Sequence, residues 1–83
     1  MESKTTPEFW QRFNALPTDI QKLARKNFDL WKQNPRHPSL RFRPHGRGKW
    51  SARIGDHYRA LADFDGEIFI WIWIGSHEDY NKL

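Results

Sequence analysis

The residues best suited to chemistry are two arginines in the middle of the chain and a histidine and a tyrosine near its end. Arg53 and Arg59 are six positions apart, and His77 precedes Tyr80 by three. An imidazole titrates near neutral pH, and a guanidinium can bind two phosphate oxygens at once. A phenol can stack on an unpaired base or donate its hydroxyl. Together these four candidate catalytic residues suit the cleavage of RNA by its own 2′-hydroxyl.

A block of positive charge surrounds the two arginines. Residues 36–59 hold seven Lys or Arg against one acid, Asp56, whereas residues 60–83 hold five acids against Lys82. Such a concentrated block indicates a polyanionic partner more specifically than a high pI does. The alternative is a solvated basic face. We favour contacts with RNA phosphates by four further cations: Arg41, Arg43, Arg47 and Lys49.

Length and composition exclude several classes of protein. We expect residues 1–83 to form a single domain, as is usual for a chain this short. The absence of cysteine excludes disulfides, a thiolate nucleophile and thiolate metal ligands. The four histidines lack the spacing of a metal site, so neither a metal nor another cofactor is expected. With no signal-peptide pattern, and no apolar run near the ~20 residues of a membrane helix, we expect the protein in the cytoplasm.

Two amphipathic helices are predicted in the first part of the chain. Thr6 can cap the first helix, and Pro17 ends it. Residues 18–21 read as a capping box for the second helix, which stops at Asn34 because the residue before a proline disfavours the helical conformation. The short connection predicts an antiparallel helical hairpin. The positions expected to face the core from the second helix are Ile20, Leu23, Ala24, Asn27, Phe28 and Trp31.

After Pro38 the apolar pattern changes from helical to alternating. It predicts four strands: residues 39–43, 49–54, 58–62 and 68–74. In the last strand four isoleucines alternate with Phe69, Trp71 and Trp73, which indicates a strand covered on both faces. We expect both tryptophans to be core residues rather than platforms for RNA bases.

The fold class is therefore α+β. It comprises an N-terminal antiparallel helical hairpin packed on a four-stranded, mainly antiparallel twisted sheet. After the last strand, Ser76 and Asp79 favour one short helical turn.

The loop between the second and third predicted strands decides whether the two arginines can meet. If Gly55 and Asp56 form a two-residue turn, Arg53 pairs with Tyr58, and Arg59 faces the other side of the sheet. A three-residue loop or a bulge places Arg53 opposite Arg59 on one face. The catalytic hypothesis requires the second arrangement, and the sequence allows both.

Five short motifs follow one another in an order that is more specific than any one of them. They are Leu16-Pro17 with Ile20-Gln21, Asn34-Pro35 with His37-Pro38-Ser39-Leu40, Trp50-Ser51-Ala52-Arg53-Ile54-Gly55, His57-Tyr58-Arg59-Ala60-Leu61, and Trp73-Ile74-Gly75-Ser76-His77-Glu78-Asp79-Tyr80. In these motifs, from Phe9 onward, the chain resembles the RelE/ParE superfamily of toxins from bacterial type II toxin–antitoxin systems.

The resemblance implies a RelE-like, microbial RNase-like fold that works without a metal. It implies that Arg53 and Arg59 occupy basic positions of the sheet, and that His77 occupies a C-terminal catalytic position filled by Arg or His in different members. Tyr80 lies close to the aromatic residue that often follows. The sequence departs from the family in a short N-terminus, which leaves the first strand brief or absent, and in Ser51, which stands where some ribosome-dependent members have a lysine.

Two functions are compatible with the resemblance. The first is a ribosome-dependent endoribonuclease that cleaves mRNA and inhibits translation; the second is a non-enzymatic, ParE-like toxin that binds and inhibits DNA gyrase or another protein. Both imply a cognate antitoxin, with an acidic or amphipathic segment that covers the basic patch, and a toxin that is monomeric or in a hetero-oligomer with the antitoxin. They differ in whether toxicity survives substitution of His77 and Arg59.

Overall fold

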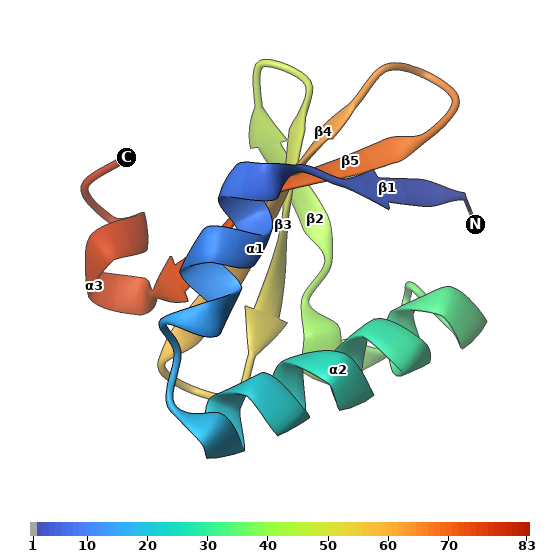
Figure 1. Cartoon of the computed structure of the whole chain (residues 1–83). Helices are drawn as coiled ribbons and strands as arrows, with labels where there is room; N and C mark the ends of the chain where they lie inside the picture. The colour runs from blue at the N-terminus through green and yellow to red at the C-terminus, as the bar shows by residue number, and fades with distance from the viewer. Residues whose placement is uncertain (1) are drawn as a thin grey trace.

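Five strands form one sheet in the computed structural model, which describes residues 2–83 (Figure 1). Their order is β1-β5-β4-β3-β2; β1 pairs in parallel with β5, and the remaining neighbours are antiparallel. In chain order the elements are β1 (Ser3–Thr5), α1 (Pro7–Asn14), α2 (Thr18–Gln33), the 3-10 turn η1 (Pro38–Leu40), β2 (Arg43–Gly46), β3 (Lys49–Ile54), β4 (Tyr58–Phe64), β5 (Phe69–Ser76) and α3 (His77–Tyr80).

The α+β fold class with helices on a mainly antiparallel sheet is confirmed, but the expected number of strands is one too low. The additional strand is β1, which consists of three mostly exposed polar residues at the sheet edge. It joins the sheet through its backbone alone, so no alternating apolar pattern reveals it. None of the helices within residues 2–83 is long and apolar enough to cross a membrane.

Capping bonds set the ends of the helices. Thr6 caps α1, because its Oγ1 accepts a backbone N–H of the first turn at 3.2 Å. The capping box predicted at residues 18–21 is wrong: α2 begins after Pro17 with no side-chain cap. Gln21 turns back instead, and its Nε2 donates to the carbonyl of Leu16 at 3.1 Å. The connection between α1 and α2 is thus held by a side chain of α2.

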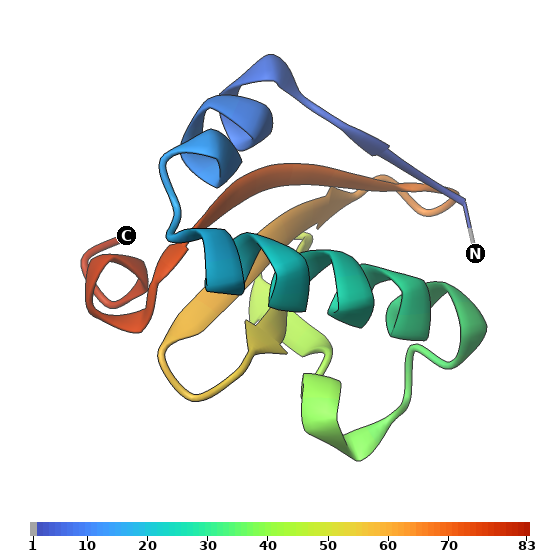
Figure 2. The same ribbon diagram turned by 60° about the horizontal axis from the view of Figure 1, so that its bottom comes forward.

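The two helices run in roughly opposite directions from their short connection, as the predicted helical hairpin requires (Figure 1). They meet at the connection and are inclined to one another over the same face of the sheet (Figures 1 and 2). Each helix is oriented by its own strand, α1 by β5 and α2 by β3. An apolar groove of about 340 Å³ remains between them, with Trp10 and Phe28 in its lining.

The strand predicted for residues 39–43 is wrong in position. Residues 38–40 form η1 instead, because the imidazole Nδ1 of His37 accepts the N–H of Ser39 at 3.2 Å. Arg41 then adopts a left-handed conformation with φ 44°, and β2 begins two residues later. The other three predicted strands are confirmed: β3 has the predicted bounds, and β4 and β5 differ from them by one or two residues at their ends.

A bulge breaks the alternation predicted for the last strand. Two consecutive residues of β4 pair with Trp73 and Trp71, so Ile72 is an extra residue in β5. Trp71 and Ile74 therefore both lie in the core under the helices, whereas Trp73 belongs to the opposite face. Both tryptophans are buried, as expected, at 5% and 6% exposure.

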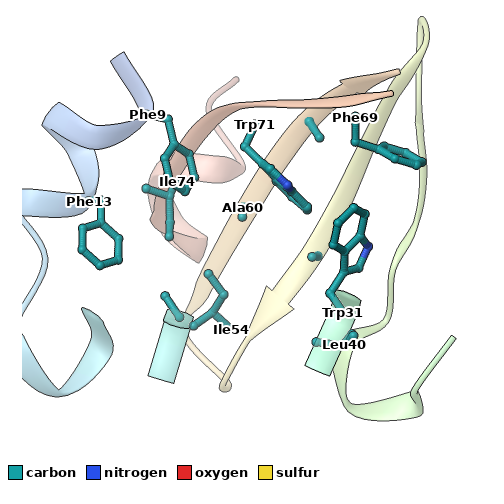
Figure 3. Packing of buried hydrophobic residues seen from close by; sticks show 12 residues of the cluster. Phe9, Phe13, Trp31, Leu40, Ile54, Ala60, Phe69, Trp71 and Ile74 are labelled. Carbon is teal, nitrogen blue, oxygen red and sulfur yellow. The ribbon is translucent and has the colours of Figure 1, made fainter. Parts of the chain in front are cut away.

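Trp31 lies at the centre of the core between α2 and the sheet (Figure 3). Its side chain is 1% exposed, and its ring meets the rings of Phe42, Phe69 and Trp71 edge-on at centroid distances of 5.6, 5.5 and 5.3 Å. Such edge-to-face pairs add to the hydrophobic gain of burial. The core thus depends on a few large aromatic side chains, which suits a chain of this length.

Candidate active site

The β3–β4 hairpin brings Arg53 and Arg59 directly opposite one another. Its loop has three residues, 55–57, and the register pairs Ile54 with Tyr58 and Arg53 with Arg59. This is the arrangement that the catalytic hypothesis requires. Like charges placed opposite each other on a sheet are destabilising by themselves, so the pair favours an anion beside it.

A hollow of about 70 Å³ lies on the face of the sheet opposite α1 and α2. Side chains alternate along β3: Ala52 and Ile54 belong to the core under the helices, so Ser51 and Arg53 face the hollow. We call it the cationic hollow, and it is lined by Arg41, Arg43, Ser51, Arg53, Arg59, His77 and Tyr80. All four candidate catalytic residues and two of the four candidate RNA-binding residues therefore meet at one place.

The end of β5 and the short helix α3 carry His77 and Tyr80 to the hollow. Ser76 caps α3, because its Oγ accepts the N–H of Asp79 at 3.1 Å, as the sequence predicts. The backbone N–H of His77 donates to the carbonyl of His57 at 2.7 Å. The loop that sets the arginine register thus also holds the first residue of α3.

Backbone carbonyls orient the two opposed arginines. Arg53 Nε donates to the carbonyl of Gly55 at 2.8 Å, and its guanidinium forms an ion pair with the carboxylate of Asp56. Arg59 Nη1 donates to the carbonyl of Tyr58 at 2.8 Å. Because Asp56 is 76% exposed, its ion pair is screened by water, and Arg53 remains a usable phosphate ligand.

Positive charge is concentrated around Arg59. Burial and the neighbouring charge of Arg53 lower the pKa of the Arg59 guanidinium, Tyr80 opposes this shift, and Arg41 and Arg43 add to it. Arginine stays charged at neutral pH in spite of such a shift. In residues 2–83 neither Arg59 nor the two arginines near β2 have a carboxylate partner. The cationic hollow therefore offers unneutralised donors to an anion.

The other two candidate RNA-binding residues, Arg47 and Lys49, lie outside the cationic hollow. Lys49 Nζ is 2.6 Å from a carboxylate oxygen of Asp63, its partner in the β3–β4 register. Arg47 is exposed in the turn between β2 and β3. The structure therefore groups Arg41 and Arg43 with the candidate catalytic residues and separates Arg47 and Lys49 from them.

Two residues at the site were not among the candidates. Ser51, noted only as a departure from the family, is 5% exposed and lines the cationic hollow. His45 Nδ1 lies 2.6 Å from Tyr80 Oη. No motif marks His45, because the contact joins segments 35 residues apart.

Gly75 pairs with Arg59 in the β4–β5 register and leaves room for Trp73. A methyl group at position 75 would lie 2.7 Å from the Trp73 indole, a distance at which the buried ring must move. We expect Gly75→Ala to lower the free energy of unfolding by about 1–3 kcal/mol, as for other overpacked sites. Urea denaturation measures this loss. An unchanged midpoint would show that Trp73 moves freely.

Solved structures share the fold over nearly the whole chain. YafQ from Escherichia coli strain BL21(DE3) superposes with a TM-score of 0.76 at 9% identity, covering 95% of this chain and 96% of that chain. The YoeB/ParE toxin from Agrobacterium tumefaciens superposes with a TM-score of 0.69 at 18% identity, covering 93% of this chain and 99% of that chain. A chain of the toxin–antitoxin complex RelBE2 from Mycobacterium tuberculosis superposes with a TM-score of 0.72 at 21% identity, covering 92% of this chain and 96% of that chain. The fold is therefore that of the RelE-like toxins.

The family follows from the sequence. Residues 18–82 match the family model of the ParE-like toxin domain, from the first residue of α2 to beyond α3. The chain therefore belongs to the ParE-like toxin domain family, within the RelE/ParE superfamily that its motifs indicate. No curated protein gives a sequence match.

Proposed function

We propose that this toxin is an endoribonuclease that cleaves mRNA on the ribosome without a metal and so inhibits translation. The observation that carries the proposal is the grouping of Arg53, Arg59, His77 and Tyr80 around the cationic hollow. These side chains come from β3, β4 and α3, so only the folded chain assembles them.

The reaction has requirements that these side chains can meet. The 2′-oxygen attacks phosphorus while the bond to the 5′-oxygen breaks, so the reaction needs a base, an acid and cations near the phosphate. Arg53 and Arg59 supply hydrogen-bond donors where negative charge grows on the phosphate oxygens. His77, exposed at the hollow, supplies the imidazolium that protonates the leaving 5′-oxygen.

Arg41 and Arg43 extend the positive charge beyond the reacting phosphate. Both line the cationic hollow from the segment that leads into β2 and from β2 itself. Phosphate contacts of this kind position a single strand without reading its sequence. In the proposed function these two arginines hold the neighbouring nucleotides.

A cognate antitoxin is the proposed protein partner. Structures with the same fold include complexes that are named as toxin–antitoxin pairs, RelBE2 from Mycobacterium tuberculosis and RelB–RelE from Methanococcus jannaschii. We expect an acidic antitoxin segment to cover the cationic hollow, because its carboxylates would neutralise the unpaired arginines and exclude RNA.

Arg59→Gln tests the proposed function. The substitution removes the charge and the forked donor from the centre of the cationic hollow. We expect cleavage of ribosome-bound mRNA to slow by about 10²–10³-fold, the usual loss for one preorganised donor. Arg36→Gln is the matched control, because it removes the same charge from an exposed position outside the hollow, and its rate should stay near that of the wild type. If both variants lose the same cleavage rate, Arg59 contributes only net charge to the activity.

Inhibition of DNA gyrase by binding alone is the second candidate function. It is favoured by the match to a ParE-like toxin domain and by Ser51, which stands where some ribosome-dependent members carry a lysine. It predicts that Arg59→Gln and His77→Ala remain fully toxic, with intact mRNA and a DNA-damage response. A growth assay with both variants, together with measurement of mRNA integrity, separates the two functions.

A further inference from the structure

A hydrogen bond joins the C-terminal helix to the opposite end of the sheet. Tyr80 Oη and His45 Nδ1 are 2.6 Å apart, and the two rings lie with centroids 4.9 Å apart. Tyr80 belongs to α3, which follows β5, whereas His45 belongs to β2 at the far edge, with β4 and β3 between them. The bond therefore spans the face that carries the cationic hollow and holds Tyr80 in its lining.

The lining of the cationic hollow leaves one catalytic role unfilled. With His77 as the acid, the reaction still needs a base for the 2′-hydroxyl proton. The remaining residues of the lining are arginines, Ser51 and Tyr80; guanidinium groups do not release or take a proton near neutral pH, and an isolated hydroxyl is a poor base. Lys49 on β3 carries an amine, but this amine is paired with the carboxylate of Asp63. Tyr80 with His45 behind it is the pair that can take a proton.

The direction of the hydrogen bond decides what Tyr80 can do. In the tautomer with hydrogen on Nε2, the Nδ1 atom of His45 accepts the phenolic proton. The Tyr80 oxygen then presents lone pairs, and no proton, to a ligand in the hollow. Such an oxygen accepts a hydrogen bond from a ribose 2′-hydroxyl, a donor that deoxyribose lacks.

We infer that His45 acts through Tyr80 as a positioning residue and proton acceptor for the 2′-hydroxyl of the RNA substrate, an inference that rests on the proposed function. The 2′-hydroxyl gives its proton to the Tyr80 oxygen while the phenolic proton passes to His45 Nδ1. The 2′-oxygen bonds to phosphorus, the bond from phosphorus to the 5′-oxygen breaks, and His77 protonates that oxygen. One histidine gains a proton and the other loses one, and exchange with water restores both.

Single-turnover cleavage of ribosome-bound mRNA tests this role with three variants. We expect His45→Ala to lower the rate by about 10²-fold, at the low end of the range for general acid–base groups, and Tyr80→Phe to do the same. The double variant should be no slower than either single one, because residues that act as a unit are not additive. If the fold-loss in cleavage rate of the double variant equals the product of the two single fold-losses, the inference is overturned.

His45→Gln separates the proton role from simple positioning. The glutamine carbonyl can accept the Tyr80 hydroxyl but cannot take its proton at neutral pH. We expect this variant to bind mRNA-programmed ribosomes as the wild type does and to cleave as slowly as His45→Ala. If it instead cleaves at the wild-type rate, His45 only holds Tyr80 in place, and the proton role is refuted.

Nitrogen-15 NMR of the histidine rings gives a readout that needs no substrate. We expect His45 Nδ1 to be unprotonated in the neutral ring and its resonance to move in Tyr80→Phe; a protonated Nδ1 in the neutral ring would overturn the inference. If the wild-type protein cleaves mRNA and His45→Ala cleaves it at the same rate, this inference is refuted and the proposed function still stands. A wild-type protein that does not cleave mRNA at all would remove both, even if the NMR signature is present.

Discussion

Replacing His77 with alanine is expected to slow cleavage of ribosome-bound mRNA by about 10²–10⁴-fold, the range for loss of a general acid or base. His77 places an imidazole in the lining of the cationic hollow, and imidazole is the most common general acid or base in enzymes. Without it the 5′-oxygen leaves as an alkoxide, while the arginines still bind the phosphate. The loss should therefore appear in the single-turnover rate and leave ribosome binding largely intact.

Two measurements show whether the loss is chemical. His77 is exposed at the start of α3, so His77→Ala should unfold at nearly the wild-type urea concentration. His77→Arg keeps a cation at the site without an easily lost proton, and we expect it to bind ribosomes as the wild type does and to cleave nearly as slowly as His77→Ala. Cleavage by His77→Ala at the wild-type rate would remove this imidazole from the mechanism and favour a toxin that acts by binding.

Replacing Trp31 with alanine is expected to lower the free energy of unfolding by about 3–5 kcal/mol, the usual cost of emptying a large aromatic site. Trp31 is 1% exposed and is surrounded by Phe42, Phe69, Trp71 and Phe28. Small domains are stable by only about 5–15 kcal/mol, so this variant should lose much of its stability. Urea denaturation followed by tryptophan fluorescence measures the change.

Trp10 provides the matched control for Trp31. It is 37% exposed and lies over Phe9 and Phe13 beside the groove between α1 and α2. Because a good part of its ring already contacts water, Trp10→Ala should lose about 1–2 kcal/mol. A similar loss in both variants would show that the aromatic cluster around Trp31 is not the centre of the core.

Much of the fold could be read from local patterns. The caps at Thr6 and Ser76, the end of α2 at Asn34 and the three strands from Lys49 onward depend mainly on near neighbours in the chain, and each is present in the structure. Two of the errors have a different origin. Strand β1 is held by backbone bonds to β5, and the bulge at Ile72 depends on how β5 pairs with β4, so no local pattern reports either one.

The candidate site was predicted unevenly for the same reason. The residue types of Arg53, Arg59, His77 and Tyr80 indicated phosphodiester chemistry, and all four line the cationic hollow. Whether Arg53 faces Arg59 depended on the length of one loop, which the sequence allowed in two forms. The contact of His45 with Tyr80 lay beyond any pattern, because it joins the edge strand β2 to the helix that follows β5.

By itself, the sequence determined the class of protein, the α+β composition and the kinds of side chain that do the work, because these depend on residue type, spacing and motif order. The tertiary structure decided the three-residue loop between β3 and β4, the grouping of Arg41 and Arg43 with the opposed arginines, and the pairing of Lys49 with Asp63. These features depend on strand register and on which face each side chain takes. A shift of one residue reverses every face, and only the packing of the whole sheet against α1 and α2 selects the register.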